Sequence, residues 1–332
     1  MNMLGLGWVG LVAALGLACS ASDGAGSDGA VGGSGGAGAG GGTGGTSASG
    51  GSGGSLVVDG GGGSGGQPAS CQFVDMLFVI DNSPSMGKYQ EALAAAFPSF
   101  VDAMYAKLPE NVNFHVGIVT TSFFTGNCGE AVSNCKTTAT DQEVLAHYLK
   151  PTDGSTGTNG EQGRLFEHAG LRYFEANSSD ADASPLKTWF TGAAVAAGET
   201  GCSFEMATAA AGYSAHAANA THNQGFFRDE DAVLLVFVLS DEPDKSPETL
   251  DTYVSMLNAK KTACGGDKCI LTAGLVDSCV QGVNNTVWQF LNAFGEPPIV
   301  GDIDDETKYS AVVGDALAQV VKQTCDEIAV VK

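Results

Sequence analysis

The chain has 332 residues, a formal net charge of −22 and nine cysteines. Its first 70 residues contain no Lys or Arg and about half of the glycines, so the part able to fold begins near Cys71 and has room for one large domain but not two. The negative charge argues against nucleic acid as a partner, because a phosphate backbone requires a basic surface.

The N-terminus predicts export. Residues 3–18 form a nearly uninterrupted apolar run, too short to span a bilayer comfortably and of the length of a signal-peptide core. Its end, with Ala18 before Cys19, resembles the lipobox of bacterial lipoproteins, whose cysteine is lipidated and becomes the mature N-terminus. Gly16 stands where a leucine is usual, and the run lacks a basic residue before it. We expect residues 1–19 to be a lipoprotein signal peptide that anchors the protein to the cell envelope, at the outer membrane or cell surface.

Residues 20–70 consist of Gly, Ser, Ala and Thr with scattered Asp. Such a composition cannot bury enough apolar surface to offset the entropy of ordering. We expect a flexible tether with a root-mean-square reach of roughly 40 Å.

The cysteine count agrees with export. Removing Cys19 for lipidation leaves eight cysteines (9 − 1), which allows four disulfides in an oxidising compartment. The pairs Cys128/Cys135 and Cys264/Cys269 are the easiest to bridge, although spacing does not fix the connectivity. Zinc is disfavoured, because no CxxC pair is present and no His lies at ligand spacing from a Cys. The disulfide candidates are Cys71, Cys128, Cys135, Cys202, Cys264, Cys269, Cys279 and Cys325.

Beyond residue 71, short apolar runs alternate with helical stretches, which predicts a doubly wound α/β fold: a mostly parallel sheet with helices on both faces. The unbroken apolar run 233–239 indicates a central strand. An irregular insertion is expected at 122–199, followed by an Ala-rich helix after Glu205. The other expected strands are 73–80, 114–120 and 270–276. The other expected helices are 87–107, 247–262, 286–294 and 309–324, with helical pieces at 142–149 and 164–175 inside the insertion.

The first strand ends at a group of polar residues. Asp81, Ser83 and Ser85 occupy alternate positions in the loop between this strand and the following helix. In an open α/β sheet ligands bind at the carboxyl ends of strands, and alternate loop residues can direct one carboxylate and two hydroxyls at a common centre. An all-oxygen set suits Mg²⁺, or Mn²⁺ in its place. The competing interpretation is that Asp81 and Ser83 cap the helix.

The pattern Asp-x-Ser-x-Ser after such a strand resembles the metal-ion-dependent adhesion site of von Willebrand factor A (VWA) domains. The later segments follow that family's order. The resemblance implies a further hydroxyl ligand from a Gly-containing loop, where Ser203 matches best and Thr200 is the rival. It also implies an Asp at the end of the central strand, Asp241, which acts through a coordinated water.

The likeness covers roughly residues 71–330. The Asp-Glu-x-Asp sequence after the central strand resembles the cysteine-containing VWA-like lipoproteins of large-genome, myxobacterial-type bacteria. Glu242 and Asp244 are then either solvated or additional ligands that favour Ca²⁺. A Cys71–Cys325 bridge fits this fold, because its two ends lie together.

The resemblance implies recognition rather than catalysis. An acidic residue of a protein partner would fill the open position of the cation, and the membrane would be contacted through the lipid anchor alone. One alternative is a metal-independent VWA scaffold in an envelope complex. The other is a haloacid-dehalogenase-like phosphotransferase, which requires a carboxylate as general acid where Ser83 stands. A hydroxyl cannot do that work near neutral pH.

Overall fold

The computed structural model describes residues 72–124, 140–152 and 159–322, all within one compact unit. Its centre is a six-stranded sheet of order β3-β2-β1-β4-β5-β6, in which every neighbouring pair is parallel except β2 and β3. The strands are β1 (Phe73–Ile80), β2 (Asn113–Thr120), β3 (Tyr173–Asn177), β4 (Ala232–Ser240), β5 (Ile270–Val276) and β6 (Ile299–Asp302).

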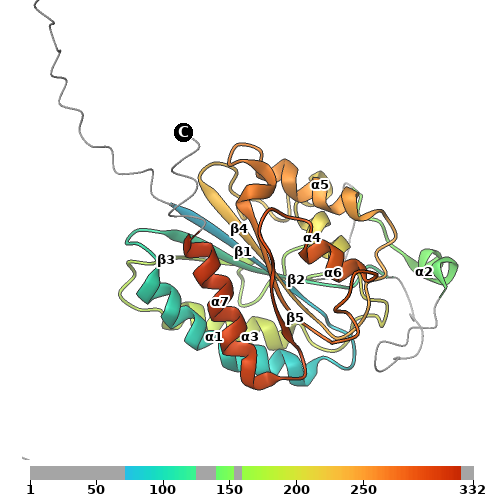
Figure 1. Cartoon of the computed structure of the whole chain (residues 1–332), viewed down its shortest axis with the longest axis horizontal. Coiled ribbons are helices and arrows are strands. Elements are labelled where there is room, and N and C mark those ends of the chain that lie inside the picture. The colour runs from blue at the N-terminus through green and yellow to red at the C-terminus, as the bar shows by residue number, and fades with distance from the viewer. Residues whose placement is uncertain (1–71, 125–139, 153–158, 323–332) are drawn as a thin grey trace, which may run out of the picture. The chain divides into compact units, whose positions relative to one another are not determined.

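Helices cover both faces of the sheet (Figure 1). One face carries α1 (Gly87–Lys107), α3 (Ser184–Ala196) and α7 (Tyr309–Lys322). The other carries α4 (Ala207–Ser214), α5 (Leu250–Lys260) and α6 (Thr286–Leu291), and α2 (Asp141–His147) lies to one side. Short 3₁₀ turns occur at Ala217–Asn219, Gly266–Cys269 and Glu306–Lys308.

The core is divided by the sheet, and β1 contributes to both halves. Phe78 and its alternate neighbours belong to a cluster with Phe97 and Phe190, whereas Leu77 and Val79 belong to a second cluster under α4. All nine residues of β4 are buried. Strands covered on both faces lose the alternation of apolar and polar residues, which is why the central strands are continuous apolar runs in the sequence.

The predicted fold class is confirmed, and the strands 73–80 and 270–276 and the helix 87–107 lie where the sequence placed them. The helix expected at 164–175 is wrong. Residues Tyr173–Asn177 instead form β3, the antiparallel edge strand paired with β2. Only one of its five residues is buried, so it lacks the apolar run that marks the central strands. The short strand β6 and the helix α3 were not predicted.

Several predictions lie outside the described residues: the signal peptide, the tether, and the cysteines at 19, 71, 128, 135 and 325. Cys264 and Cys269 form a disulfide, and Cys202 and Cys279 are also disulfide-bonded. Within the described ranges, no helix has both the length and the apolar character needed to cross a membrane.

Candidate metal centre

The candidate site lies at the topological switch point of the sheet, where successive strands are added on opposite sides of β1. The strand that follows β1 in sequence, β2, pairs on one side of it, and β4 pairs on the other. The loops after β1 and β4 therefore leave adjacent strand ends, the usual ligand position in an open α/β sheet. Ile80 is in register with Leu239, and the backbone N–H of Asp81 donates to the carbonyl of Leu239 at 2.9 Å.

The Asp81 side chain forms the floor of the site. It is fully buried, and its Oδ1 accepts a hydrogen bond from the Ser83 backbone N–H at 2.9 Å. Its Oδ2 accepts from Ser240 Oγ at 2.8 Å. The Gln90 side chain, from the first turn of α1, donates to the Asp81 carbonyl at 2.9 Å and so fixes the loop against the helix.

Ser83, Ser85 and Asp241 form a row of polar side chains between the buried Asp81 and the solvent. Ser83 Oγ lies 3.0 Å from Ser85 Oγ, and Ser85 Oγ donates to Asp241 Oδ1 at 3.2 Å. Ser83 is buried, Asp241 is partly exposed and Ser85 is exposed. The structure thus brings together Asp81, Ser83, Ser85 and Asp241, with one side of the group open to solvent.

The loop before α4 packs directly on the loop after β1. The Gly201 N–H donates to the Asn82 carbonyl at 2.8 Å, and a Cβ added at Gly201 would overlap the Asn82 side-chain amide, which would then have to move. Thr200 is exposed, whereas Ser203 is buried. No hydrogen bond among the described residues joins either hydroxyl to Asp81.

The loop before α4 also places Glu205 beside the Asp81 carboxyl group. Glu205 was not among the site residues predicted from the sequence. Its side chain is 1% exposed, and its Oε2 accepts a hydrogen bond from the Thr121 hydroxyl. Burial raises the pKa of Glu205 well above its ordinary value, and the neighbouring Asp81 carboxylate raises it further. An acidic residue inside an otherwise apolar, buried segment was the available sequence signal.

The two remaining candidate acids have different surroundings. Glu242 is buried beside the floor, where burial and then the charges of Asp81 and Asp241 raise its pKa to about 8. Asp244 instead binds the first turn of α4: it accepts from the backbone N–H of Thr208 at 3.1 Å and from the Thr208 hydroxyl at 2.6 Å. Asp244 therefore acts as a helix cap supplied by a distant loop.

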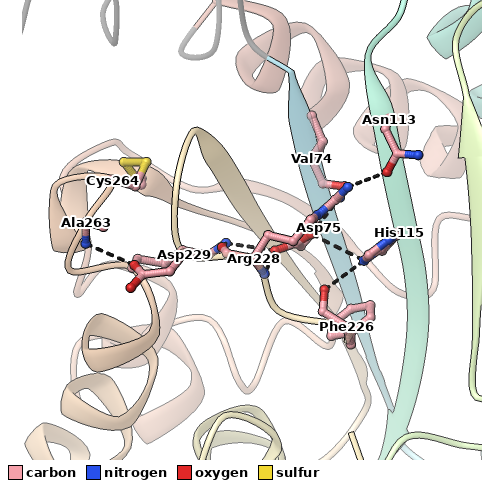
Figure 2. Close-up of polar contacts among 11 residues, drawn as sticks. Val74, Asp75, Asn113, His115, Phe226, Arg228, Asp229, Ala263 and Cys264 are labelled. Atoms are coloured by element: carbon pink, nitrogen blue, oxygen red, sulfur yellow. Dashed lines mark hydrogen bonds and ion pairs between the residues drawn. A yellow bond between two sulfur atoms is a disulfide. The ribbon is translucent and has the colours of Figure 1, made fainter. Parts of the chain in front are cut away.

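A buried aspartate within β1 and another directly after it have different electrostatic surroundings. Asp75, near the start of β1, is fully buried and is neutralised by protein cations. Arg228 Nε donates to it at 2.7 Å (Figure 2), and Lys261 Nζ donates to it at 2.8 Å. Asp81, directly after the end of β1, is equally buried. Within the described residues, no Lys, Arg or His forms an ion pair with Asp81, Glu205 or Glu242.

Without a compensating cation, the Asp81 carboxylate is disfavoured. Burial, followed by the charge of Asp241, raises its pKa to about 6. Burial also raises the pKa of Asp241. A buried carboxylate ordinarily requires a positive partner or a proton.

The residues present fit a hard divalent cation. The donors are carboxylate and hydroxyl oxygens, the ligand type of Mg²⁺, Mn²⁺ and Ca²⁺. One of these oxygens, Glu205 Oε1, is buried and receives no hydrogen bond from an N–H or hydroxyl of the described residues. No three His, Cys, Asp or Glu side chains in the described ranges are grouped as a metal site, so a cation here would depend on the serine hydroxyls as well.

Comparison with known proteins gives a likeness among solved structures alone, since no family model and no curated protein matches the chain. The chain is similar to a von Willebrand factor type A protein from Catenulispora acidiphila, with 12% identity and a TM-score of 0.35, over 77% of this chain and 48% of that one. It is also similar to proximal thread matrix protein 1 from the mussel byssus, a structure with a zinc-occupied MIDAS motif, with 12% identity and a TM-score of 0.36, over 74% of this chain and 46% of that one. The chain thus spans about half the length of these proteins. Because the identity and the TM-scores are this low, no function is inferred from the likeness. The α/β fold class follows from the strand order and the helices on both faces of the sheet.

Proposed function

We propose that the folded unit is a VWA-type recognition module that binds Mg²⁺, or Mn²⁺ or Ca²⁺ in its place, and through the cation a partner. The observation that carries this proposal is the fully buried Asp81 carboxylate, which forms no ion pair with any Lys, Arg or His that the structure describes and lies in a group of oxygen donors open to solvent. Asp81, Ser83 and Ser85 would hold the cation, and Asp241 would orient a water on it.

The partner in this proposal is a protein that offers an acidic side chain. The exposed side of the group, at Ser85 and Asp241, is where an outside oxygen would reach the cation. A cation that keeps one exchangeable position can take such a group in place of water. The lipobox-like sequence at Cys19 supports an exported, lipid-anchored location for the module, and the acidic net charge argues against nucleic acid.

A metal-independent scaffold is the second candidate, and one observation favours it. Ser85 already donates to Asp241, and the Ser83 and Ser85 hydroxyls contact each other, so these groups satisfy one another without a cation. The enzyme alternative has no such support, because Ser83 stands where a phosphotransferase of the haloacid-dehalogenase type requires a carboxylate.

Calorimetric titration of the purified protein with Mg²⁺, Mn²⁺ and Ca²⁺ tests the proposal. We expect saturable binding by the wild type, loss of binding in Asp81→Ala, and wild-type behaviour in Asp251→Ala, an exposed aspartate on α5. An absence of binding by the wild-type protein would favour the scaffold instead. Equal binding by the wild type and Asp81→Ala would place the cation elsewhere.

A further inference from the structure

We propose that Glu205 is a direct ligand of the cation and supplies the contribution of the loop before α4, in place of the hydroxyl of Ser203 or Thr200. This inference rests on the proposed cation-dependent function and deepens it. The position and burial of Glu205, and the buried Oε1 that receives no hydrogen bond from a described N–H or hydroxyl, support this assignment.

The backbone around Glu205 is fixed on two sides. The N–H of the next residue, Met206, donates to the Thr121 carbonyl at the end of β2, with a distance of 3.2 Å. The Glu205 carbonyl accepts from the Lys245 N–H, in the loop after β4, at 2.6 Å. Glu205 is therefore held between the loops that follow β2 and β4, directly beside the end of β1.

The side chain of Glu205 is positioned but not satisfied. Thr121 donates to Oε2 and thereby sets the orientation of the carboxylate, whereas Oε1 is buried and no backbone N–H or hydroxyl in the described part of the chain donates to it. The neighbour that this carboxyl group does contact is the Asp81 side chain, and their hydrogen bond raises the pKa of Glu205 and lowers that of Asp81. Two neighbouring buried carboxyl groups repel when both are ionised, unless a cation or a proton lies between them.

The two hydroxyl groups expected from the family likeness, those of Thr200 and Ser203, are less well placed to bind the cation. Thr200 is exposed at the start of the loop, and Ser203, although buried, has no hydrogen bond to Asp81 among the described residues. A carboxylate also contributes a full negative charge to a divalent cation, which a hydroxyl does not. Two direct carboxylates, from Asp81 and Glu205, match the charge of one divalent cation.

Mn²⁺ titration of a matched set of variants tests this assignment. We expect Glu205→Gln to lower the affinity for Mn²⁺ by at least about tenfold, the lower bound for disturbing even an outer ligand. Ser203→Ala and Thr200→Val should each stay within about twofold of the wild type. Glu230→Gln, an exposed glutamate just before β4, is the control for removal of one negative charge.

A second readout separates a ligand from a structural residue. In a chelating buffer, Glu205→Gln should unfold at the same temperature as the wild type or at a higher one, because Gln stays neutral without a proton beside Asp81 and keeps a group that Thr121 can contact. In saturating Mn²⁺ the order should reverse. A loss of stability in the chelating buffer, together with unchanged Mn²⁺ affinity, would show that Glu205 is a structural residue and overturn the inference.

A third measurement is made first on the wild type and leaves Glu205 itself unchanged. Infrared spectra of the wild type with isotope-labelled glutamate should show a shift of the glutamate carboxylate band when Mn²⁺ is added, and the shift should persist in Glu242→Gln. An unchanged glutamate band at saturating Mn²⁺ would refute direct ligation by Glu205. Failure of the broader proposal is distinct, because it appears as an absence of saturable binding that Asp81→Ala removes.

Discussion

Asp75 in β1 and Asp81 directly after it are both fully buried, but the same substitution should have very different consequences at the two positions. Asp75→Asn leaves the buried Lys261 ammonium and the Arg228 guanidinium without their anion. Both cations donate to Asp75, at 2.8 and 2.7 Å, and the Lys261 side chain is fully buried. Breaking a buried ion pair costs about 3–5 kcal/mol. For a domain of this size we expect the midpoint of thermal unfolding to fall by roughly 6–20 °C.

Asp81→Asn should behave differently. In a chelating buffer it removes a buried charge that lacks a cation, and Asn can still accept one of the two hydrogen bonds made by Ser83 and Ser240. We expect a change within about 1 kcal/mol. At a cation concentration 100 times the dissociation constant, the wild type should gain about 2.7 kcal/mol and Asp81→Asn should gain nothing.

Urea unfolding followed by circular dichroism, with and without Mg²⁺, measures both effects in one experiment. The reasoning fails if Asp81→Asn costs as much as Asp75→Asn in the chelating buffer. That result would mean that the Asp81 carboxylate is satisfied by the protein itself and needs no cation.

Three further predictions concern the surroundings of the site. Asp244→Ala removes the acceptor for the Thr208 N–H and hydroxyl, so we expect a loss of about 2–4 kcal/mol in urea unfolding, and the isosteric Asp244→Asn should recover part of it. Burial alone would raise the pKa of Glu248, but hydrogen bonds from three tyrosine hydroxyls and a lysine lower it below its ordinary value of 4.5. A group whose pKa is lower in the folded state contributes stability that is fully present above pH 4.5 and is lost as the pH falls through the folded-state pKa. Glu248→Gln should therefore make the free energy of unfolding less dependent on pH on the acid side. An unchanged pH dependence there would contradict this explanation. Replacing both Cys264 and Cys269 by Ser opens a short disulfide loop and should cost about 2 kcal/mol, measured against the oxidised wild type.

The central position of one strand could be predicted from the sequence, because a strand that is covered on both faces is apolar along its whole length. Val233 to Leu239 is apolar throughout, which indicates a strand covered on both faces, and the structure places it beside β1 in the middle of the sheet. The edge strand β3 could not be read in the same way. Three of its five residues are only partly buried and one is exposed, and it owes its conformation to pairing with β2, a contact between segments far apart in the chain.

The sequence by itself determined the part of the site that is contiguous. Asp81, Ser83 and Ser85 follow a recognisable strand at alternate positions, and the loop that holds them is short and locally hydrogen-bonded. Asp241 could be predicted for the same reason, since it follows the most apolar strand of the chain.

Only the tertiary structure decided what surrounds those residues. Glu205 becomes part of the floor because the β2 and β4 loops hold its backbone beside the end of β1. Likewise, Asp75 is paired with distant Arg228 and Lys261, whereas Asp81 has no ion pair among the described residues. Whether a buried charge is compensated depends on neighbours brought together by the fold, and spacing along the chain does not reveal them.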